Sequence, residues 1–576
     1  MNALGFKERS TIYNEIEGFG IIEDSIVQKN KQLRKENVTK EIKKVTKSDI
    51  IQSFKELLGN MHYIQTTIEE YIIHNNEEFV NLQHEFLDGG YIAIDIKDNI
   101  LKIVTYAKKA YIIDMAQIDK KIYGVIFSSY VPRKICFDTR LLYKSQYTSE
   151  LTINHPYDIS HIVKMYCNQK VGSLKELIEL FTNDANDNEN TLLYNIFQIK
   201  NTLNDLLERF SLMSLLNKEM KIISIVSKAE VTGIPFSQEA YDDFLYQLNE
   251  NYNTAIKLVV GKLGEEKLGA DIKPLLNNKD KLINLLHSND LSPTFNKDFW
   301  ADMKNTDLQG LIIANELINK YDNCDLTIKE DRMFLEYELY DEYGNIKSNF
   351  SLDGRYVIAK EGKLIVTGSY SDLYFRIFAS LSNIDFIINS VNNDTFITAL
   401  TLEAFKMNTP TSRFLARNFL KAYIEGYIEP QDLEDYFFNK LDTKFSNIGK
   451  FQNTFNENSC KIIKFIKRFY RNQSRDKRFC FNKEPALHQY IKMTEADILK
   501  SAIILVSETI SIFNETNKYN INLVGIQNGR IILEADEGAL NIAVDTLNRK
   551  LTQAFDMYVR NVQGVCNVVA SSSLKL

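Results

Sequence analysis

The sequence contains few of the residues that cross-link a chain or break it into separate parts. Its 6 cysteines are scattered, with no Cys-x-x-Cys pair, and its 8 prolines form no Pro-rich linker. Scattered cysteines argue against structural zinc and indicate a reducing compartment, so we expect a cytoplasmic protein. A chain of 576 residues should form several domains, and the shortage of linkers indicates that these domains pack against one another.

Long apolar runs and an excess of basic residues are also missing. No apolar stretch reaches the roughly 18 residues of a membrane span, and no signal-peptide pattern stands at the N-terminus, so no membrane partner is expected. The formal net charge is −7. This charge excludes a general basic surface for nucleic acid, so any such binding has to come from local patches.

Apolar residues recur with the period of a helix in some segments and with the period of a strand in others. These patterns predict an α+β multidomain protein. Strand-length segments such as YIAIDIKD and AYIIDMA come early, helical patterns occupy residues 201–330, and strands and helices mix from residue 331 onward. Residues 1–58 are charged and mostly helical in pattern. Because Glu is interspersed in their Lys-rich stretch, we interpret them as a solvated helical extension rather than an arm that binds nucleic acid.

The clearest local signal is NLVGIQNGRIILEAD, residues 522–536. Two apolar runs flank Asn528-Gly529, and Asn-Gly is the strongest short-range sequence signal for a β-hairpin. A type I′ turn requires positive φ at its two central residues, which Asn and Gly adopt at little cost. We therefore expect a tight turn here, just before a final amphipathic helix.

Five separated segments resemble, in the same order, motifs of family A DNA polymerases of the bacterial DNA polymerase I large-fragment type. They are similar to the start of the 3′–5′ exonuclease domain, the segment joining the exonuclease and polymerase domains, motif A, a palm helix and motif C. The segments are YIAIDIK after NMHYIQTTIEEYI, then residues 218–245, 363–383, 494–506 and 522–536. The matching residues include Glu219, Met220, Gly233, Ile234, Tyr370, Ser371, Leu373 and Arg376.

The resemblance covers roughly residues 59–576 and implies the architecture of that family. We expect an RNase H-like 3′–5′ exonuclease-like domain followed by a right-hand palm, fingers and thumb polymerase fold. The expected domains are a helical extension (1–58), the exonuclease-like domain (59–205), a thumb-like helical region (206–330), the first palm-like part (331–390), a fingers-like region (391–490) and the second palm-like part (491–576).

The resemblance fails at the residues that carry the family's chemistry. Family A polymerases hold two Mg²⁺ ions on palm carboxylates, about 4 Å apart. Here Ser369 replaces the motif A Asp, Tyr374 replaces the Glu five residues on, and Gln527-Asn528-Gly529 replaces the His-Asp-Glu of motif C. A hydroxyl and an amide are neutral, whereas Mg²⁺ prefers carboxylate oxygens. The sequence therefore predicts no catalytic metal site, with the Asn528-Gly529 turn facing Ser369.

The exonuclease-like segment departs from the family in the same way. Its Asp-x-Glu pair becomes Asp95-x-Lys97, its middle carboxylate corresponds to Asp138, and its final Tyr-x-x-x-Asp becomes Tyr194-x-x-x-Gln198. Two carboxylates cannot assemble the usual two-metal site, and Lys97 would put a cation where a metal belongs. The resemblance therefore implies that exonuclease chemistry is lost as well.

Basic residues that would contact DNA persist in part. The family's fingers helix corresponds to Arg413, Arg417, Lys421 and Glu425, so it keeps basic residues and loses its aromatic platform. Residues 461–479 carry eight basic residues and one acidic residue, with aromatic residues interleaved, which suits contact with phosphates and bases. An amphipathic helix packed by its Ile/Phe face explains this segment equally well. The candidate contacts are Arg376, Arg413, Arg417, Lys421, Lys464, Lys467, Arg468, Arg471, Arg475, Lys477, Arg478 and Lys500.

Other polar residues near these motifs have simpler interpretations than metal binding. Asp372 either lies on the opposite face of the strand from the motif A position or caps the helix that follows. Glu534, Asp536 and Glu537 are interpreted as acids at a helix N-terminus, where the helix dipole favours them. His488 is interpreted as an ordinary polar residue.

These observations support one preferred hypothesis and two alternatives. The preferred one is a pseudoenzyme of a phage or mobile element, without a cofactor, that binds primer-template DNA, single-stranded DNA, an active polymerase or another replication protein. The first alternative is an active DNA-directed DNA polymerase with displaced Mg²⁺ ligands. The second is a protein-binding scaffold without DNA affinity.

Overall fold

The structure is a computed structural model, and it describes three parts of the chain. These are residues 61–263, 327–395 and 486–575, apart from residues 62, 88, 168–169, 183–187, 210, 351 and 383–384, together with Glu56 and Arg417. The expected helical extension and most of the expected thumb-like and fingers-like regions lie outside the described residues. None of the helices in the described part is long and apolar enough to cross a membrane.

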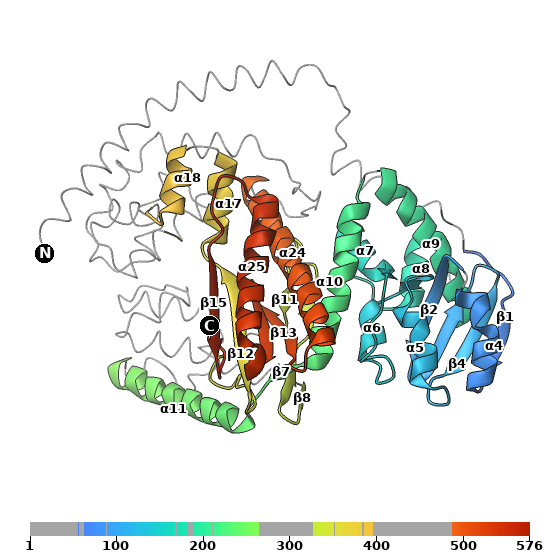
Figure 1. The fold of residues 1–576 in the computed structure, drawn as a ribbon, viewed down its shortest axis with the longest axis horizontal. Coiled ribbons are helices and arrows are strands. Elements are labelled where there is room, and N and C mark those ends of the chain that lie inside the picture. Colours follow the sequence, from blue (N-terminus) through green and yellow to red (C-terminus); the bar gives the residue numbers. More distant parts are fainter. Residues whose placement is uncertain are drawn as a thin grey trace, which may run out of the picture.

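The N-terminal part of the described chain, here called the six-stranded unit, is built on one mixed sheet (Figure 1). The middle of the sheet is an antiparallel meander, and parallel strands extend it on both sides. The order is β1-β4-β3-β2-β5-β6. The strands are β1 (Glu69–Ile73), β2 (Tyr91–Lys97), β3 (Ile100–Val104), β4 (Lys109–Asp114), β5 (Arg133–Cys136) and β6 (Pro156–Asp158).

Helices cover this sheet because its strands are apolar on both faces. Phe79, Phe86 and Phe127 from α4 and α5 form a core on one face, and α9 packs against β2, β3 and β5. The helices are α4 (Asn76–Leu87), α5 (Lys120–Ser128), α6 (Thr139–Lys144), α7 (Ile159–Cys167), α8 (Leu174–Thr182) and α9 (Glu189–Arg209).

Helix α10 (Met213–Thr232) links the two halves of the molecule and ends at Gly233. Gly233 has φ 72°, and a Cβ there would lie 3.0 Å from the Phe334 ring and 3.2 Å from the Met333 carbonyl oxygen, so only glycine fits this turn. The chain then enters a small three-stranded sheet and α11. These elements are β7 (Ile234–Pro235), β8 (Thr327–Lys329), β9 (Arg332–Phe334) and α11 (Gln238–Leu263).

The C-terminal part, here called the four-stranded unit, is an antiparallel sheet with α24 and α25 packed against it (Figure 1). Gly368 lets α25 approach the sheet, since a Cβ there would lie 2.9 Å from a Leu551 methyl group. The strand order is β13-β14-β12-β15. The elements are β12 (Lys363–Tyr370), β13 (Ile521–Gln527), β14 (Arg530–Asp536), β15 (Cys566–Ser571), α17 (Leu373–Ser382), α18 (Asp385–Asn392), α24 (Ala486–Thr516), η2 (Glu537–Ala539) and α25 (Leu540–Tyr558), with the short pair β10 (Tyr337–Glu338) and β11 (Lys347–Ser348).

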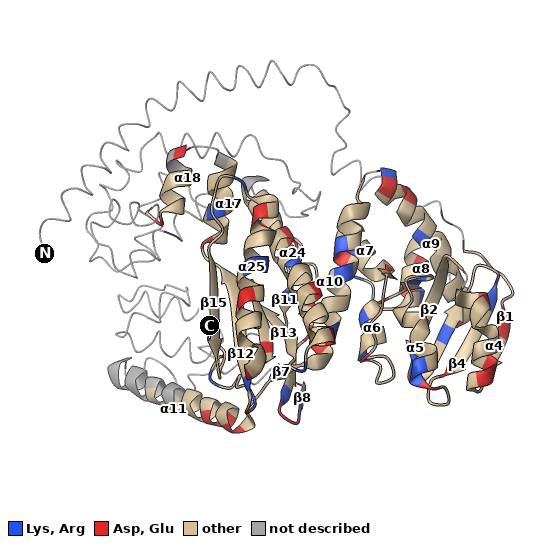
Figure 2. Ribbon diagram, in the orientation of Figure 1, with Lys and Arg blue, Asp and Glu red and all other residues tan. Residues whose placement is uncertain are grey.

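One hydrophobic core joins the two units, and a buried ion pair lies within it. Lys500 on α24 donates to the Glu219 carboxylate on α10 at 2.7 Å, and both side chains are fully buried. The same Lys500 ammonium donates to the Leu339 carbonyl at 2.9 Å, and His161 on α7 lies 3.2 Å from the Glu219 carboxylate. Figure 2 shows Lys or Arg and Asp or Glu positions interspersed along the helices, and Glu219 and Lys500 differ from most of them because both side chains are fully buried.

Substituting Lys500→Met should leave the Glu219 carboxylate in the core without its main cation. Breaking a buried pair typically costs about 3–5 kcal/mol, so the urea midpoint should fall sharply. Lys144→Met is the matched control, because Lys144 and Glu336 form an exposed pair at 2.7 Å, worth about 0–1 kcal/mol. Equal small losses for the two variants would contradict a structural role for Lys500.

Candidate functional site

The hairpin expected at residues 522–536 is present as β13 and β14. Gln527 pairs with Arg530 across a two-residue turn, in which Asn528 has φ 48° and Gly529 has φ 76°. These positive φ values at both central positions are those of a type I′ turn, whose twist matches the flanking strands. The prediction of a tight turn at Asn528-Gly529 is confirmed.

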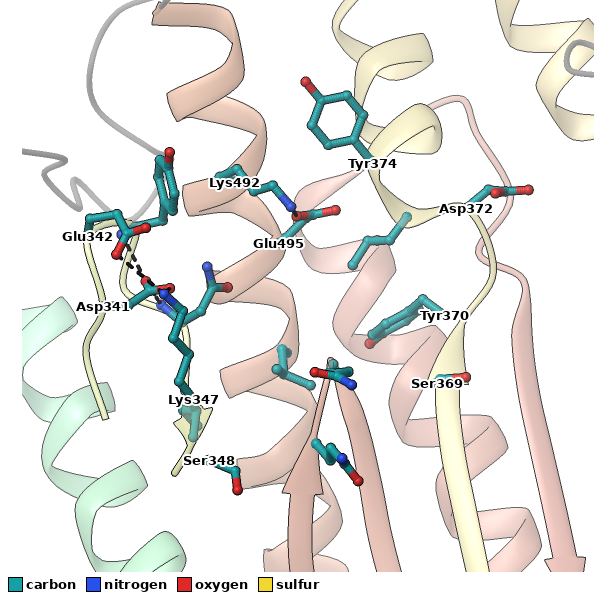
Figure 3. A pocket seen from close by; sticks show the side chains of 18 of the residues that line it. Asp341, Glu342, Lys347, Ser348, Ser369, Tyr370, Asp372, Tyr374, Lys492 and Glu495 are labelled. Carbon is teal, nitrogen blue, oxygen red and sulfur yellow. Dashed lines mark hydrogen bonds and ion pairs between the residues drawn. The ribbon is translucent and has the colours of Figure 1, made fainter. Parts of the chain in front are cut away.

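The hairpin tip and the end of β12 line one cavity of about 830 Å³ (Figure 3). Strand β14 pairs with both β13 and β12, and this places the turn beside the strand that ends in Ser369 and Tyr370. The structure therefore brings Ser369, Tyr374 and the segment Gln527-Asn528-Gly529 together in the cavity wall, as expected. The remaining wall comes from residues 341–350 and from α24.

Four carboxylates line the cavity, and those on its left side in Figure 3 are paired. Asp341 and Glu342 lie 3.3 Å and 3.5 Å from the Lys347 ammonium. Asp341 also accepts the backbone N–H groups of Tyr343 and Asn345, at 2.9 Å and 2.8 Å. Asp341 therefore holds its own turn together, a role that the DEYGN sequence signals but that the sequence reasoning missed.

The other two carboxylates are paired as well. Glu495 lies 2.8 Å from Lys492, one turn earlier on α24. Asp372 lies 2.9 Å from the Arg417 guanidinium, and Figure 3 shows it on the opposite side of the cavity from Asp341. The four carboxylates thus pair with three cations around the cavity, Asp341 and Glu342 sharing Lys347, and they do not form one cluster.

The residues at this cavity do not fit the two Mg²⁺ ions that the resemblance implies. The positions beside each other at the strand ends offer the Ser369 hydroxyl and the Asn528 amide, which are weak neutral ligands. Within the described ranges, no group of three or more His, Cys, Asp or Glu side chains is arranged to hold a metal ion. No reaction step through a metal is supported by this donor set.

Tyr374 lines the cavity and contacts the buried His488, which does not itself line it. The Tyr374 hydroxyl lies 3.2 Å from Nδ1 of His488, and the Tyr343 ring stands edge-on to the imidazole with centroids 5.5 Å apart. The Lys492 ammonium lies 5.5 Å from the centre of the Tyr374 ring. An aromatic side chain thus lines the cavity where the resemblance implies a Glu, and His488 is a buried residue within hydrogen-bond distance of it.

Two of the candidate DNA contacts are wrong because their side chains are buried. Arg376 is 1% exposed and donates to the carbonyls of Ser371 and Gln563, both at 3.0 Å, and to Asp394 at 2.9 Å. Lys500 belongs to the buried pair described above. Arg417 is half-exposed and pairs with Asp372. The candidates outside the described residues are Arg413, Lys421, Lys464, Lys467, Arg468, Arg471, Arg475, Lys477 and Arg478.

The interpretation of Glu534 as a helix N-terminal acid is also wrong. Glu534 lies in β14 and is fully buried, 2.5 Å from Arg332 and 3.7 Å from Lys363. Asp536 ends β14 and stands at the N-cap position of the helical turn η2, without a side-chain cap hydrogen bond, and Glu537 lies in the first turn of η2. The alternating strand pattern continued two residues further than the acidic cluster suggested.

A second group of carboxylates lies at the carboxyl ends of the parallel strands in the six-stranded unit. Asp138 caps α6 and accepts two hydrogen bonds from the Arg140 guanidinium, at 3.2 Å and 3.0 Å. Asp158 is the last residue of β6, is buried, and accepts the N–H groups of Thr139 and His161 at 2.7 Å and 2.8 Å. Burial and the neighbouring Asp138 raise the pKa of Asp158. The sequence reasoning missed Asp158, which the pattern PYD at a strand end signals.

The other predicted exonuclease positions lie around this group without completing a metal site. Burial raises the pKa of Asp95, which lies in β2. Lys97 is 72% exposed and lies 3.5 Å from Glu189. Gln198 lies in α9 and supplies an amide where the family has a carboxylate. Arg140 is the cation beside Asp138, and its other nitrogen donates to the Tyr337 carbonyl of the neighbouring unit at 3.3 Å.

Glu230 lies in α10 and contacts Tyr337, where the six-stranded unit meets the rest of the chain. It should make the stability of the protein depend on pH. Burial raises the pKa of Glu230 to about 7, and its carboxylate accepts the Tyr337 N–H at 2.8 Å. The folded state therefore binds this proton more tightly than the unfolded state, and stability should fall as pH rises from about 4.5 to about 7.

Substituting Glu230→Gln should keep the hydrogen-bond acceptor and remove the titration. We expect the variant to be more stable than the natural protein at pH 8 by about 1–3 kcal/mol, and close to it at pH 5, in urea unfolding at both values. A stability difference that is the same at pH 5 and pH 8 would contradict this assignment.

Comparison with solved structures finds a similar protein over most of the chain. The match is the "POL domain of Pol1 from M. smegmatis complex with DNA primer-template and dNTP", with a TM-score of 0.67 and 15% sequence identity. It covers 87% of this chain and 99% of that chain. No protein-family model and no curated protein matches the sequence. At this identity the similarity shows the fold, and the fold only.

Proposed function

We propose that this chain, which has the fold of a family A DNA polymerase domain, is a pseudo-polymerase that binds and does not transfer nucleotides. The observation that carries the proposal is the cavity at the hairpin tip, where Ser369 and Asn528 stand in place of the family's metal-binding carboxylates. The carboxylates that remain there are occupied by Lys347, Lys492 and Arg417.

The proposal assigns the units of the structure to the parts of a polymerase. The four-stranded unit, with α24 and the hairpin, corresponds to the palm, in two chain segments over residues 331–390 and 491–576. The six-stranded unit corresponds to an RNase H-like exonuclease-like domain over residues 59–205. Thumb-like and fingers-like regions are proposed for residues 206–330 and 391–490.

Loss of the chemistry is proposed for both centres, and no cofactor is proposed. Two-metal catalysis requires ions that stabilise the attacking and the leaving oxygen together. The polymerase-like cavity offers neutral ligands at the two adjacent strand ends. In the exonuclease-like unit, the Arg140 guanidinium binds Asp138 with two nitrogen atoms, so a fixed cation already neutralises that carboxylate.

Primer extension tests the proposal directly. The purified protein should not extend a primer on a template with Mg²⁺ or Mn²⁺, because the cavity lacks the charge to hold two ions. The double variant Ser369→Asp/Asn528→Asp should gain saturable Mn²⁺ binding, measured by electron paramagnetic resonance. Asp tolerates the positive φ of position 528, so the turn should survive.

The control for metal binding is Asp372→Asn/Glu495→Gln, which removes two cavity carboxylates that are already paired. This variant should not change the Mn²⁺ signal of the natural protein. Robust, metal-dependent primer extension by the natural protein would contradict the pseudo-polymerase proposal. It would favour an active polymerase with displaced metal ligands.

The binding role proposed for the chain is contact with DNA through residues 461–479. Eight basic residues against one acidic residue make this segment strongly positive in a chain of net charge −7. The structural neighbour was solved with a DNA primer-template, which supports a DNA ligand for the same fold. An active polymerase or another replication protein is the alternative partner.

Charge reversal in this segment should weaken binding to primer-template DNA. The variant Lys464→Glu/Arg468→Glu/Arg471→Glu should bind at least tenfold more weakly in fluorescence anisotropy, and its salt slope should fall by about 0.9 for each lost phosphate contact. The matched control is the same charge change at exposed lysines, Lys121→Glu/Lys228→Glu/Lys329→Glu. A natural protein with no salt-dependent affinity for DNA would leave only the protein-binding alternative.

A further inference from the structure

The parallel strands of the six-stranded unit start at one end of the sheet, and aromatic rings and cations lie side by side there. This end of the sheet is here called the edge. Tyr91 of β2 pairs with Arg133 of β5, and Lys134 pairs with Pro156 of β6, so His155 stands level with Arg133. Neighbouring strands lie about 4.8 Å apart, so the three side chains form one row across three strands. The carboxylates Asp138 and Asp158 lie at the other end of the same strands.

Three cations of this edge, Arg133, Lys134 and Lys200, have no carboxylate partner in the part of the chain that the structure describes. The Arg133 guanidinium lies 5.9 Å and the Lys200 ammonium 3.5 Å from the centre of the Tyr91 ring. Lys200 is 5% exposed and has the neutral Asn201 amide at 3.2 Å as its other partner. Lys134 donates to the Ser129 carbonyl. Buried or half-buried cations without a counter-ion favour an anionic ligand.

The positive charge of this edge affects the pKa of His155. Its pKa is lowered by burial and by the charges of Arg133, Lys134 and Lys221. Lys221 on α10 is the one member of this group with a carboxylate partner among the described residues, Glu508 at 2.8 Å. At neutral pH the imidazole is therefore a mainly uncharged ring set among cations.

Exposed aromatic rings lie at the same edge as the cations. Tyr130 is 67% exposed, and its ring stands edge-on to the His155 ring with centroids 5.1 Å apart. Tyr106 follows β3 at the same edge, is 44% exposed and donates to the Asn201 side chain. A Cβ added at Gly90, just before Tyr91, would meet no atom within 4 Å, so the space beside Gly90 is open.

We propose that this edge, made by Tyr91, Tyr130, Arg133, His155, Lys200 and Lys221, binds the backbone of a single-stranded nucleic acid. Arg133 and Lys221 contact the phosphates, the buried Lys200 adds positive charge beside the Tyr91 ring, and the exposed Tyr130 ring stacks on a base. Rings and cations at the spacing of neighbouring strands favour a strand of nucleotides over an acidic peptide, which needs cations only. The site shares no residue with the hairpin cavity or with residues 461–479, so it does not rest on the function proposed above.

Fluorescence anisotropy of the full chain with labelled oligonucleotides tests this site. The probes are single-stranded dT and U oligomers of twenty nucleotides, and the preferred one identifies DNA or RNA as the ligand. Arg133→Glu/Lys221→Glu should weaken binding at least tenfold and lower the salt slope by about 0.7 for each lost phosphate contact. Tyr130→Ala should weaken binding about fivefold or more without changing the slope.

Controls separate this site from general charge effects and from loss of folding. Lys121→Glu/Lys329→Glu makes the same charge change at exposed positions and should bind as the natural protein does. Arg133→Gln removes the charge without reversing it, and it should weaken binding with an unchanged circular dichroism spectrum and thermal midpoint.

The outcomes also distinguish this site from the segment at residues 461–479. Unchanged binding by Arg133→Glu/Lys221→Glu, with loss of binding on reversal of Lys464, Arg468 and Arg471, would overturn the edge site and leave the proposed function intact. Loss of binding only in the edge variants would support the edge site. Equal competition by poly-glutamate, with no effect of Tyr130→Ala, would also overturn it, because an acidic peptide would then be the better ligand.

Discussion

The buried pair of Glu219 and Lys500 is the interaction on which the arrangement of the two units depends. It joins α10, which continues from the six-stranded unit, to α24, which lies on the four-stranded sheet. His161 adds a third element at 3.2 Å from the same carboxylate. Charges in a core are tolerated only when each finds its partner in good geometry, so this network fixes the relative position of the helices more strictly than apolar packing does.

The motif positions divide into two groups, those that match the family and those that differ from it. Those that persist are structural in this fold: Glu219 and Lys500 pair with each other, Gly233 makes a turn that no other residue fits, and Arg376 braces the start of α17. Those that differ, Ser369 and Asn528, stand at the cavity. The residues that match the family thus lie in the scaffold, and those that differ from it lie at the cavity.

Much of the fold was predictable, because it rests on local rules and on ordered motifs. The Asn528-Gly529 turn follows from backbone preference, and the likeness to a family A polymerase followed from motif order. Burial was not predictable: Arg376 and Lys500 are basic in sequence but lie in the core, because their partners come from distant segments. Asp158 was missed for the same reason, since it accepts the N–H of Thr139 from a separate element. Asp341 has a local role, in its own turn, which the sequence signals and the motif comparison passed over.

The charge pairing in the cavity has a consequence for redesign. Asp341, Glu495 and Asp372 each pair with a cation of the cavity, so each carboxylate already has a local electrostatic partner. Carboxylates introduced at the strand ends would have to hold a metal ion without help from these acids, unless the lysines and the arginine that pair with them were replaced as well.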